Sequence, residues 1–251
     1  TTTTTKTDGL SKSLRSCTNR CLPDAMSDLS GSLTIALSRQ DGSGIVSIDS
    51  TRPVGAARVF AGLPVRETAR RLPLLFSVCG TAQAAACAAA CEQALGIHAN
   101  AAALQQRRML LAAEMIREHL WRLFLDWPRA LDRPPAASAM AETMRAYQCL
   151  RGLLRADVDP FAPGAETPPV DVGAATEAAA ALTRRALNDV FGTAIDRWRA
   201  QVIDRNHLDA WAAAAGTPAA ALVALLLDQG LADLGCNRVG ALPAKIAAEL
   251  G

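Results

Sequence analysis

The sequence predicts a mainly α-helical protein with a small β-hairpin near its N-terminus. Alanine is abundant throughout the 251 residues, half of all residues are hydrophobic, and only 4% are aromatic. Alanine has the highest helix propensity and a weak strand preference, and its small side chain lets helix axes approach each other closely. Several long segments with apolar residues at helical spacing follow one β-rich segment. We therefore expect a helical bundle.

The charge balance and the terminal residues limit the classes of partner and the compartment. The chain has 26 Lys and Arg against 24 Asp and Glu, a formal net charge of +2, so no nucleic-acid partner is expected. No membrane span is expected either, because Gly216-Thr-Pro218 interrupts the most apolar segment, 210–227. The first residues lack the apolar region of a secretion signal, which predicts a cytoplasmic location. The seven cysteines are then expected to be mostly reduced thiols.

Composition also predicts the domain organisation. Residues 1–30 are rich in Thr, Ser, Lys and Asp without a sustained period, which predicts a flexible N-terminal arm. Cys17 and Cys21 lie in this arm, either as half of a zinc site or as exposed thiols; the absence of a second pair and of a nearby histidine favours exposed thiols. Residues 31–251 are predicted to form a single domain, with a proline-rich loop at about 156–173.

The first regular element is a β-hairpin over residues 31–50. Residues 31–38 alternate apolar and polar side chains, 41–44 form a turn cluster of Asp, Gly and Ser, and 45–49 continue as a second β-rich segment. Two such segments around a glycine-containing turn are typical of a hairpin.

The next segment, residues 74–96, is the most informative of the chain. A short apolar run ends at Cys79, Gly80 and Thr81 supply a turn and a candidate N-cap, and an alanine-dominated stretch continues to Gly96. This pattern places Cys79 at or just before a helix N-terminus. There the helix dipole and the free backbone N–H groups favour the thiolate, the form that binds metals or attacks electrophiles.

Three further side chains follow Cys79 at steps of four residues. Gln83, Cys87 and Cys91 therefore share one slowly drifting stripe of the predicted helix. The stripe is compatible with a metal site, but a free cysteine also behaves as a small buried hydrophobic residue. We interpret Cys87 and Cys91 as packing residues and retain Cys79 as the functional candidate.

The rest of the chain predicts further helices and no known catalytic motif. Apolar spacing predicts an amphipathic helix over 101–125 that ends before Pro128, and helices over 140–154, 176–203 and after Pro218. There is no P-loop, no GxGxxG that opens a helix, no GxSxG and no HExxH. We therefore assign no catalytic residue.

In the order of these segments, the chain resembles the N-terminal half of nickel-iron hydrogenase large subunits. The resemblance runs through the hairpin, a short basic segment with Pro73, the motif Ser77-Val-Cys79-Gly-Thr-Ala-Gln83, the alanine-rich helix, and the long helix before Pro128. It covers roughly residues 31–131 and is most similar to the HupK/HoxV-type paralogues, which are accessory proteins of hydrogenase maturation. It implies a helical bundle like that of the large subunit.

The motif departs from that of the catalytic large subunit, which reads Arg-x-Cys-Gly-x-Cys and binds the nickel-iron centre through both cysteines. By the resemblance, Cys79 stands at the second cysteine, Phe76 at the first, Leu74 at the arginine and Gln83 at a histidine. The C-terminal signature Asp-Pro-Cys-x-x-Cys-x-x-His is absent. Its nearest counterpart, Asp233-Leu-Gly-Cys236, keeps one cysteine.

These departures, taken with the family, imply a scaffold for iron without nickel. The second cysteine of each pair bridges to iron in the enzymes, so Cys79, with Cys236 as a second metal ligand, would transiently hold iron that carries cyanide and carbonyl ligands. The implied role is to hold or transfer this fragment to the large-subunit precursor, with HypC/HypD-type maturation proteins as further partners. The alternative is a metal-free interaction protein that mimics the large subunit to bind maturation chaperones. A thiol enzyme lacks an evident base, so we expect a non-catalytic assembly factor.

Overall fold

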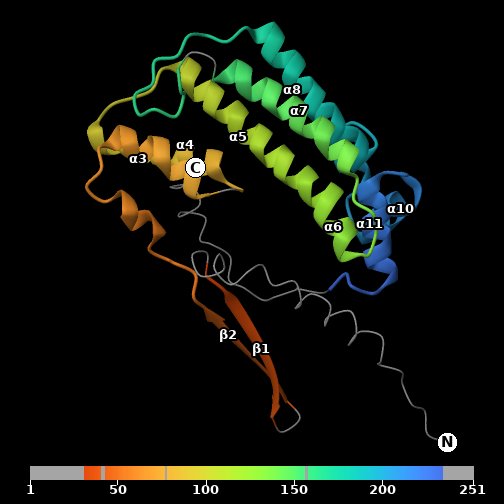
Figure 1. Cartoon of the computed structure of the whole chain (residues 1–251). Coiled ribbons are helices and arrows are strands. Elements are labelled where there is room, and N and C mark those ends of the chain that lie inside the picture. Colours follow the sequence, from red (N-terminus) through yellow and green to blue (C-terminus); the bar gives the residue numbers. More distant parts are fainter. Residues whose placement is uncertain (1–30, 41–42, 77, 156–157, 234–251) are drawn as a thin grey trace, which may run out of the picture. The chain divides into compact units, whose positions relative to one another are not determined.

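The computed structural model describes four stretches of the chain, residues 31–40, 43–76, 78–155 and 158–233. Most of these residues are helical, and the described part contains one two-stranded antiparallel sheet (Figure 1), which confirms the mainly helical class with a small hairpin. Contacts divide the chain into two compact units, Thr1–Gly62 and Leu63–Gly251. The arm predicted over 1–30 lies outside the described residues. The single domain over 31–251 and the likeness to the hydrogenase large subunit stay predictions.

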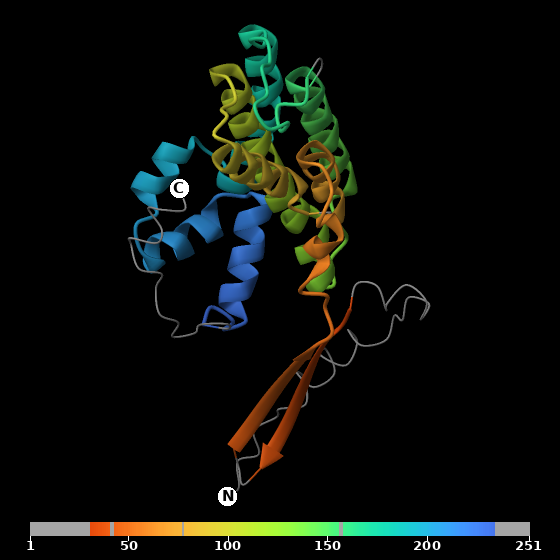
Figure 2. The same cartoon turned by 90° about the vertical axis from the view of Figure 1, so that its left-hand side faces the viewer.

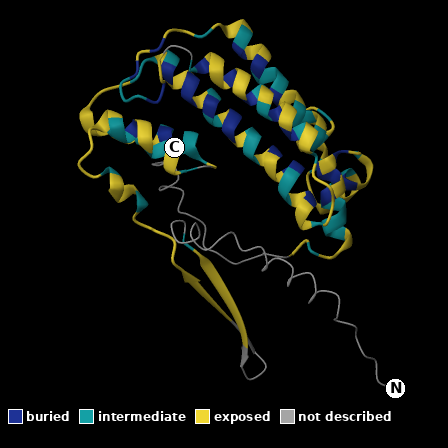
Figure 3. Cartoon of the chain, viewed as in Figure 1, coloured by how far each residue is buried: buried dark blue, intermediate teal, exposed yellow. Residues whose placement is uncertain are grey.

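The hairpin is the main element of the first unit. Strands β1 (Leu33–Gln40) and β2 (Ser43–Ser50) pair antiparallel, with Ile35 opposite Ile48. A 3-10 helix, η2 (Ala56–Phe60), follows. Because side chains alternate between the two faces of a strand, five large apolar residues share one face of the hairpin. These five are exposed (Figure 3): Leu33, Ile35, Leu37, Val46 and Ile48.

The second unit begins with two helices joined by a tight turn. Helix α3 (Val65–Arg71) leads through the 3-10 helix η3 (Leu72–Leu75), which contains Pro73, to α4 (Gly80–Leu95). Helix α4 ends, as the sequence predicts, at Gly96, whose φ of 65° is left-handed. Glycine adopts this conformation without the steric cost that a Cβ atom brings.

The longest helix of the unit is α5 (Ala101–Trp121). Its N-cap is Asn100, whose side-chain oxygen accepts a hydrogen bond from a backbone N–H three residues later. The sequence predicts that this helix ends before Pro128, but the chain continues through a π-helical segment, η4 (Arg122–Asp126), into α6 (Trp127–Ala130). Pro128 has no N–H to donate, and the oxygen of Phe124, four residues earlier, instead accepts from the Ala136 N–H (2.8 Å).

Helices α7 (Ala137–Leu154) and α8 (Val172–Ala186) lie alongside α5 (Figure 1). Their apolar stripes face α5 and enclose the main hydrophobic core, so α5 shows a line of buried residues (Figure 3). The connection between α7 and α8 adds the ring of Phe161 to this core. The largest members of the core are Leu110, Tyr147, Leu150, Leu154, Phe161 and Leu182.

The C-terminal helices follow α8 (Figure 2). They are η5 (Leu187–Phe191, π-helical), α9 (Ile195–Gln201), α10 (Arg205–Ala214) and α11 (Pro218–Asp228). Of these, η5, α10 and α11 contribute to a second core at the end of α5 and along η4. The buried members of this core come from α5, η4, α7 and α11: Leu120, Leu123, Phe124, Met140, Ala219 and Leu222. None of the described helices is both long enough and apolar enough to cross a membrane.

Candidate functional site

Cys79 lies where the sequence places it, at the N-terminus of a helix. It is the N-cap residue of α4, with φ −118° and ψ 31°, and its backbone oxygen accepts the first helical hydrogen bond from the N–H of Gln83 (2.9 Å). The Cys79 side chain is half-buried. Thr81 is not the N-cap but lies in the first turn. The position of the thiol thus agrees with the prediction, whereas its role as an iron ligand stays a prediction.

The free N–H groups of this helix end are occupied by a carboxylate from α5. The backbone N–H groups of Thr81 and Ala82 donate to Glu114, at 2.8 Å to Oε2 and 3.1 Å to Oε1. Glu114 is only 6% exposed, so this contact replaces the water that would otherwise solvate the helix end. No local sequence pattern predicts this contact, because the two partners lie more than 30 residues apart.

Gln83 is the one side chain that contacts the Cys79 sulfur through a hydrogen bond among the described residues. Its Nε2 amide donates to Sγ over 3.9 Å, one helical turn after the thiol. Such a donor favours electron density on sulfur and fixes the rotamer of the thiol. Gln83 therefore orients the Cys79 sulfur, and it can reach this sulfur because residues four apart lie on the same side of a helix.

The other thiols of α4 behave differently from a ligand pair. Cys87 and Cys91 are both half-buried, and burial, followed by the neighbouring Cys91, raises the pKa of Cys87 to about 11. Because a metal binds the thiolate and displaces the proton, a raised pKa makes Cys87 a weaker ligand than an ordinary thiol, which is consistent with the packing interpretation. Within the part of the chain that the structure describes, no three His, Cys, Asp or Glu side chains form a metal-binding group. Cys236 lies outside the described residues.

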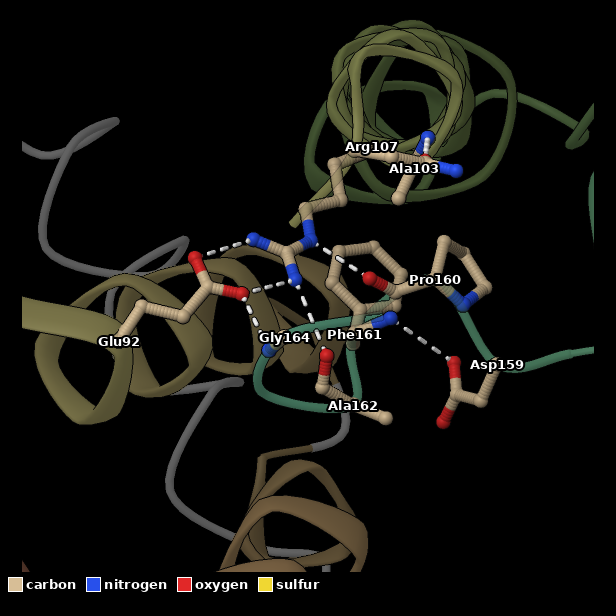
Figure 4. Close-up of polar contacts among 9 residues, drawn as sticks. Glu92, Ala103, Arg107, Asp159, Pro160, Phe161, Ala162 and Gly164 are labelled. Atoms are coloured by element: carbon tan, nitrogen blue, oxygen red, sulfur yellow. Dashed lines mark hydrogen bonds and ion pairs between the residues drawn. The ribbon is translucent and has the colours of Figure 1, made fainter. Parts of the chain in front are cut away.

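The far half of α4 is fixed by a buried ion pair (Figure 4). The Arg107 guanidinium, on α5, donates to both carboxylate oxygens of Glu92, over 3.0 and 2.7 Å. It also donates to the backbone oxygens of Pro160 (2.6 Å) and Ala162 (3.2 Å), and the Gly164 N–H donates to Glu92 (2.9 Å). We call this set the Glu92–Arg107 clamp. It ties α4 and α5 to the connection between α7 and α8.

One stripe of α5 therefore contacts both ends of α4. Arg107 and Glu114 lie seven residues apart, on either side of the core residue Leu110, and both are buried. A charged residue on an apolar helical stripe is the sequence signal that would have singled out these two positions, because buried charges require partners. The signal does not say which partners they find.

Because of the clamp, the free energy of unfolding is expected to decrease at acid pH. The hydrogen bonds from Arg107, with a further one from the Gly164 backbone, hold the pKa of Glu92 below its ordinary value of 4.5, although burial opposes them. A carboxylate whose pKa is lower in the folded state contributes its full stabilisation above its unfolded pKa and loses it as the pH falls through the folded pKa.

We expect the contribution of Glu92 to the free energy of unfolding to be constant above pH 4.5. Below pH 4.5 this contribution is expected to fall progressively. Urea unfolding followed by circular dichroism across this range measures the change. Glu92→Gln removes the titrating group and is expected to flatten the acid slope. An identical slope in this variant would show that other carboxylates cause the loss.

Comparison with known proteins finds relatives that are all named as hydrogenase expression/formation proteins. It is 34% identical over 176 residues to the hydrogenase expression/formation protein HupK of Azotobacter vinelandii, which covers 68% of this chain and 50% of the relative. It is 34% identical to HupK of Rhodobacter capsulatus over 107 residues (43% of this chain, 33% of the relative). It is 38% identical to the hydrogenase expression/formation protein HoxV of Cupriavidus necator over 95 residues (38% and 24%).

The chain thus matches half or less of the length of each of these relatives. No family model matches it, and no solved structure shows a significant match. The relatives from three organisms carry the same description, and the matches agree with the resemblance seen around Cys79. The chain belongs to the HupK/HoxV-type family of hydrogenase expression/formation proteins.

Proposed function

We propose that the chain acts in hydrogenase maturation as a non-catalytic scaffold, which holds an iron fragment with cyanide and carbonyl ligands through Cys79. From Cys79 the fragment passes to the precursor of the nickel-iron hydrogenase large subunit. The relatives are named as hydrogenase expression/formation proteins, which supports the maturation role. The observation that carries the iron proposal is the position of Cys79, a half-buried thiol at the start of α4 with an amide donor directed at its sulfur.

The chemistry of this position suits such a cargo. The iron fragment brings its own diatomic ligands, so the protein has few coordination positions to fill. A soft thiolate is a favourable ligand for iron of this kind, and the Gln83 amide would orient its sulfur.

The proposal includes a likeness of the helical unit to the large subunit, which would let the same maturation proteins recognise both. HypC/HypD-type proteins and the large-subunit precursor are the partners we infer. Nickel has no place in the proposal, because Phe76 and Gln83 stand where the resemblance puts two nickel-site residues. Cys236 remains a second candidate ligand.

Infrared spectroscopy tests the iron proposal directly. The full chain is purified without oxygen from cells that express the maturation proteins, alongside Cys79→Ser and the matched control Cys149→Ser, whose thiol is exposed on α7. We expect cyanide and carbonyl stretching bands in the unsubstituted protein and in Cys149→Ser, and their loss in Cys79→Ser. Bands that survive unchanged in Cys79→Ser, or bands absent from all three proteins, would contradict the proposal.

A second candidate function is a metal-free interaction protein that mimics the large subunit. The observation that favours it is the lack, among the described residues, of a group of three side chains able to hold a metal ion. The two functions differ in a pull-down with the maturation proteins. Stoichiometric capture that is indifferent to Cys79→Ser, together with a blank infrared spectrum, would support the interaction protein.

A further inference from the structure

A second candidate site lies in the helical unit, in a cavity that the sequence did not indicate. The cavity has a volume of about 300 Å³ and is enclosed by α3, the 73–76 connection, the first turns of α4, α5, α7 and the start of the α7–α8 connection. This volume is at the lower end of the range, roughly 300–1,000 Å³, that small-molecule sites occupy. We call it the arginine pocket, after four of its lining residues: Arg70, Arg117, Arg151 and Arg155.

Two of these guanidinium groups are held in place by aromatic rings. Arg117 lies over the ring of Tyr147, 4.8 Å from its centroid, and Arg155 lies over the ring of Phe161 at 5.6 Å. Both rings are buried. Stacking on an aromatic face restricts a guanidinium without using its N–H groups, so both donors are positioned before any ligand arrives.

The carboxylates of the pocket do not use up these donors. Glu114 gives both oxygens to the backbone at the start of α4. Asp159 accepts from Arg155 (2.8 Å) and from the Phe161 N–H (3.2 Å) through the same oxygen. Three of the four arginines pair with a carboxylate through one terminal nitrogen: Arg70 with Glu67, Arg117 with Glu118 and Arg155 with Asp159. Each of these guanidinium groups has further N–H groups, and the Nε of Arg117 is buried without a partner. Among the described residues, no carboxylate forms an ion pair with Arg151. The pocket thus keeps one unpaired arginine and N–H donors beyond those that its carboxylates use.

The positions of these N–H donors around the cavity indicate the class of ligand. Arg70, Arg117 and Arg151 lie on three different helices, and Arg155 directly follows the last of them, α7. A planar carboxylate is matched by one arginine, whereas the tetrahedral oxygens of a phosphate accept from several directions. The remaining wall is apolar, from Pro73, Leu74 and Phe76, and it offers space for an organic part next to the anion.

We propose that the arginine pocket binds a small molecule that carries a phosphate group, with its apolar part against Leu74 and Phe76. The pocket does not include the Cys79 side chain among its lining residues. Phosphate binding is therefore independent of iron binding at Cys79, and Cys79→Ser is expected to retain it.

Titration calorimetry on the full chain tests this proposal, with inorganic phosphate and AMP as the ligands and acetate as the comparison anion. We expect binding of phosphate or AMP and none of acetate at the same concentration; tighter binding of AMP would identify a phosphate ester as the source, and equal binding a free phosphate. Arg151→Gln is expected to weaken binding by about tenfold or more, since a charge-assisted contact is lost.

The matched control is Arg145→Gln, which removes the same charge from an exposed position of the same helix outside the pocket. It is expected to bind phosphate as the unsubstituted protein does. Arg70→Gln, from α3, is expected to weaken binding as Arg151→Gln does. Absence of binding, equal binding of acetate, or equal weakening by Arg145→Gln would overturn the proposal and leave the iron proposal untouched.

Discussion

Replacing Arg107 with methionine is expected to lower the free energy of unfolding by about 3–5 kcal/mol, the range for breaking a buried ion pair by removing one partner. The substitution keeps much of the side-chain volume but leaves the Glu92 carboxylate buried without its cation. It also removes the donor to the Pro160 and Ala162 oxygens. Urea unfolding at neutral pH, followed by far-ultraviolet circular dichroism, measures the loss.

The control for this prediction is an exposed ion pair of similar geometry. Arg205 and Asp209 on α10 lie 2.9 Å apart with about half of each side chain exposed, and such pairs contribute about 0–1 kcal/mol. Arg205→Met is therefore expected to be nearly neutral. The double variant Glu92→Met with Arg107→Met removes both charges and is expected to regain part of the stability lost in Arg107→Met. Equal costs for Arg107→Met and Arg205→Met would show that the clamp is not a buried charge pair in solution.

Replacing Glu114 with alanine is expected to cost about 3–6 kcal/mol, since hydrogen bonds to charged groups contribute about 1.5–3 kcal/mol each and two are lost together. The N–H groups of Thr81 and Ala82 would remain at a partly buried helix end without an acceptor. The same urea experiment measures the effect. Glu114→Gln retains one acceptor oxygen, so its cost is expected to be smaller than that of Glu114→Ala.

Glu118→Ala serves as the matched control, because Glu118 lies one turn further along α5 and is partly exposed, where it pairs with Arg117 and Arg122. Its loss is expected to cost less than 1 kcal/mol, as for other surface ion pairs. A ranking in which Glu118→Ala is as harmful as Glu114→Ala would contradict the proposed role of Glu114 at the start of α4.

The elements that the sequence predicts well are those with local signals. The alternation in residues 31–50 specified the hairpin, and the step from an apolar run to alanine at Cys79 specified the start of α4. Both depend on preferences that act within a few residues. Pro128 shows the limit of such rules: the helical chain continues past it, and the Phe124 oxygen that its missing N–H leaves free accepts from the Ala136 N–H, beyond the helix.

The contacts that the sequence could not specify are those between distant segments. Glu114 and the backbone of Thr81 are 33 positions apart, and Arg107 and the carbonyl of Pro160 are 53 apart. A charge on an apolar stripe signals that a partner exists, but the partner depends on the antiparallel arrangement of α4 and α5, which no local preference determines. The arginine pocket was missed for the same reason, because its four arginines come from three helices and the residue that follows one of them.

The contacts at the two ends of α4 have a further consequence, which concerns the rotation of this helix about its own axis. Half of its residues are alanines, which present nearly the same small methyl surface in every direction, so apolar packing alone only weakly favours one rotation of α4 against α5. Glu114 at one end and the Glu92–Arg107 pair at the other can be satisfied together in only one rotational register. The direction in which Cys79 and Gln83 face is therefore determined by polar residues that contact neither side chain.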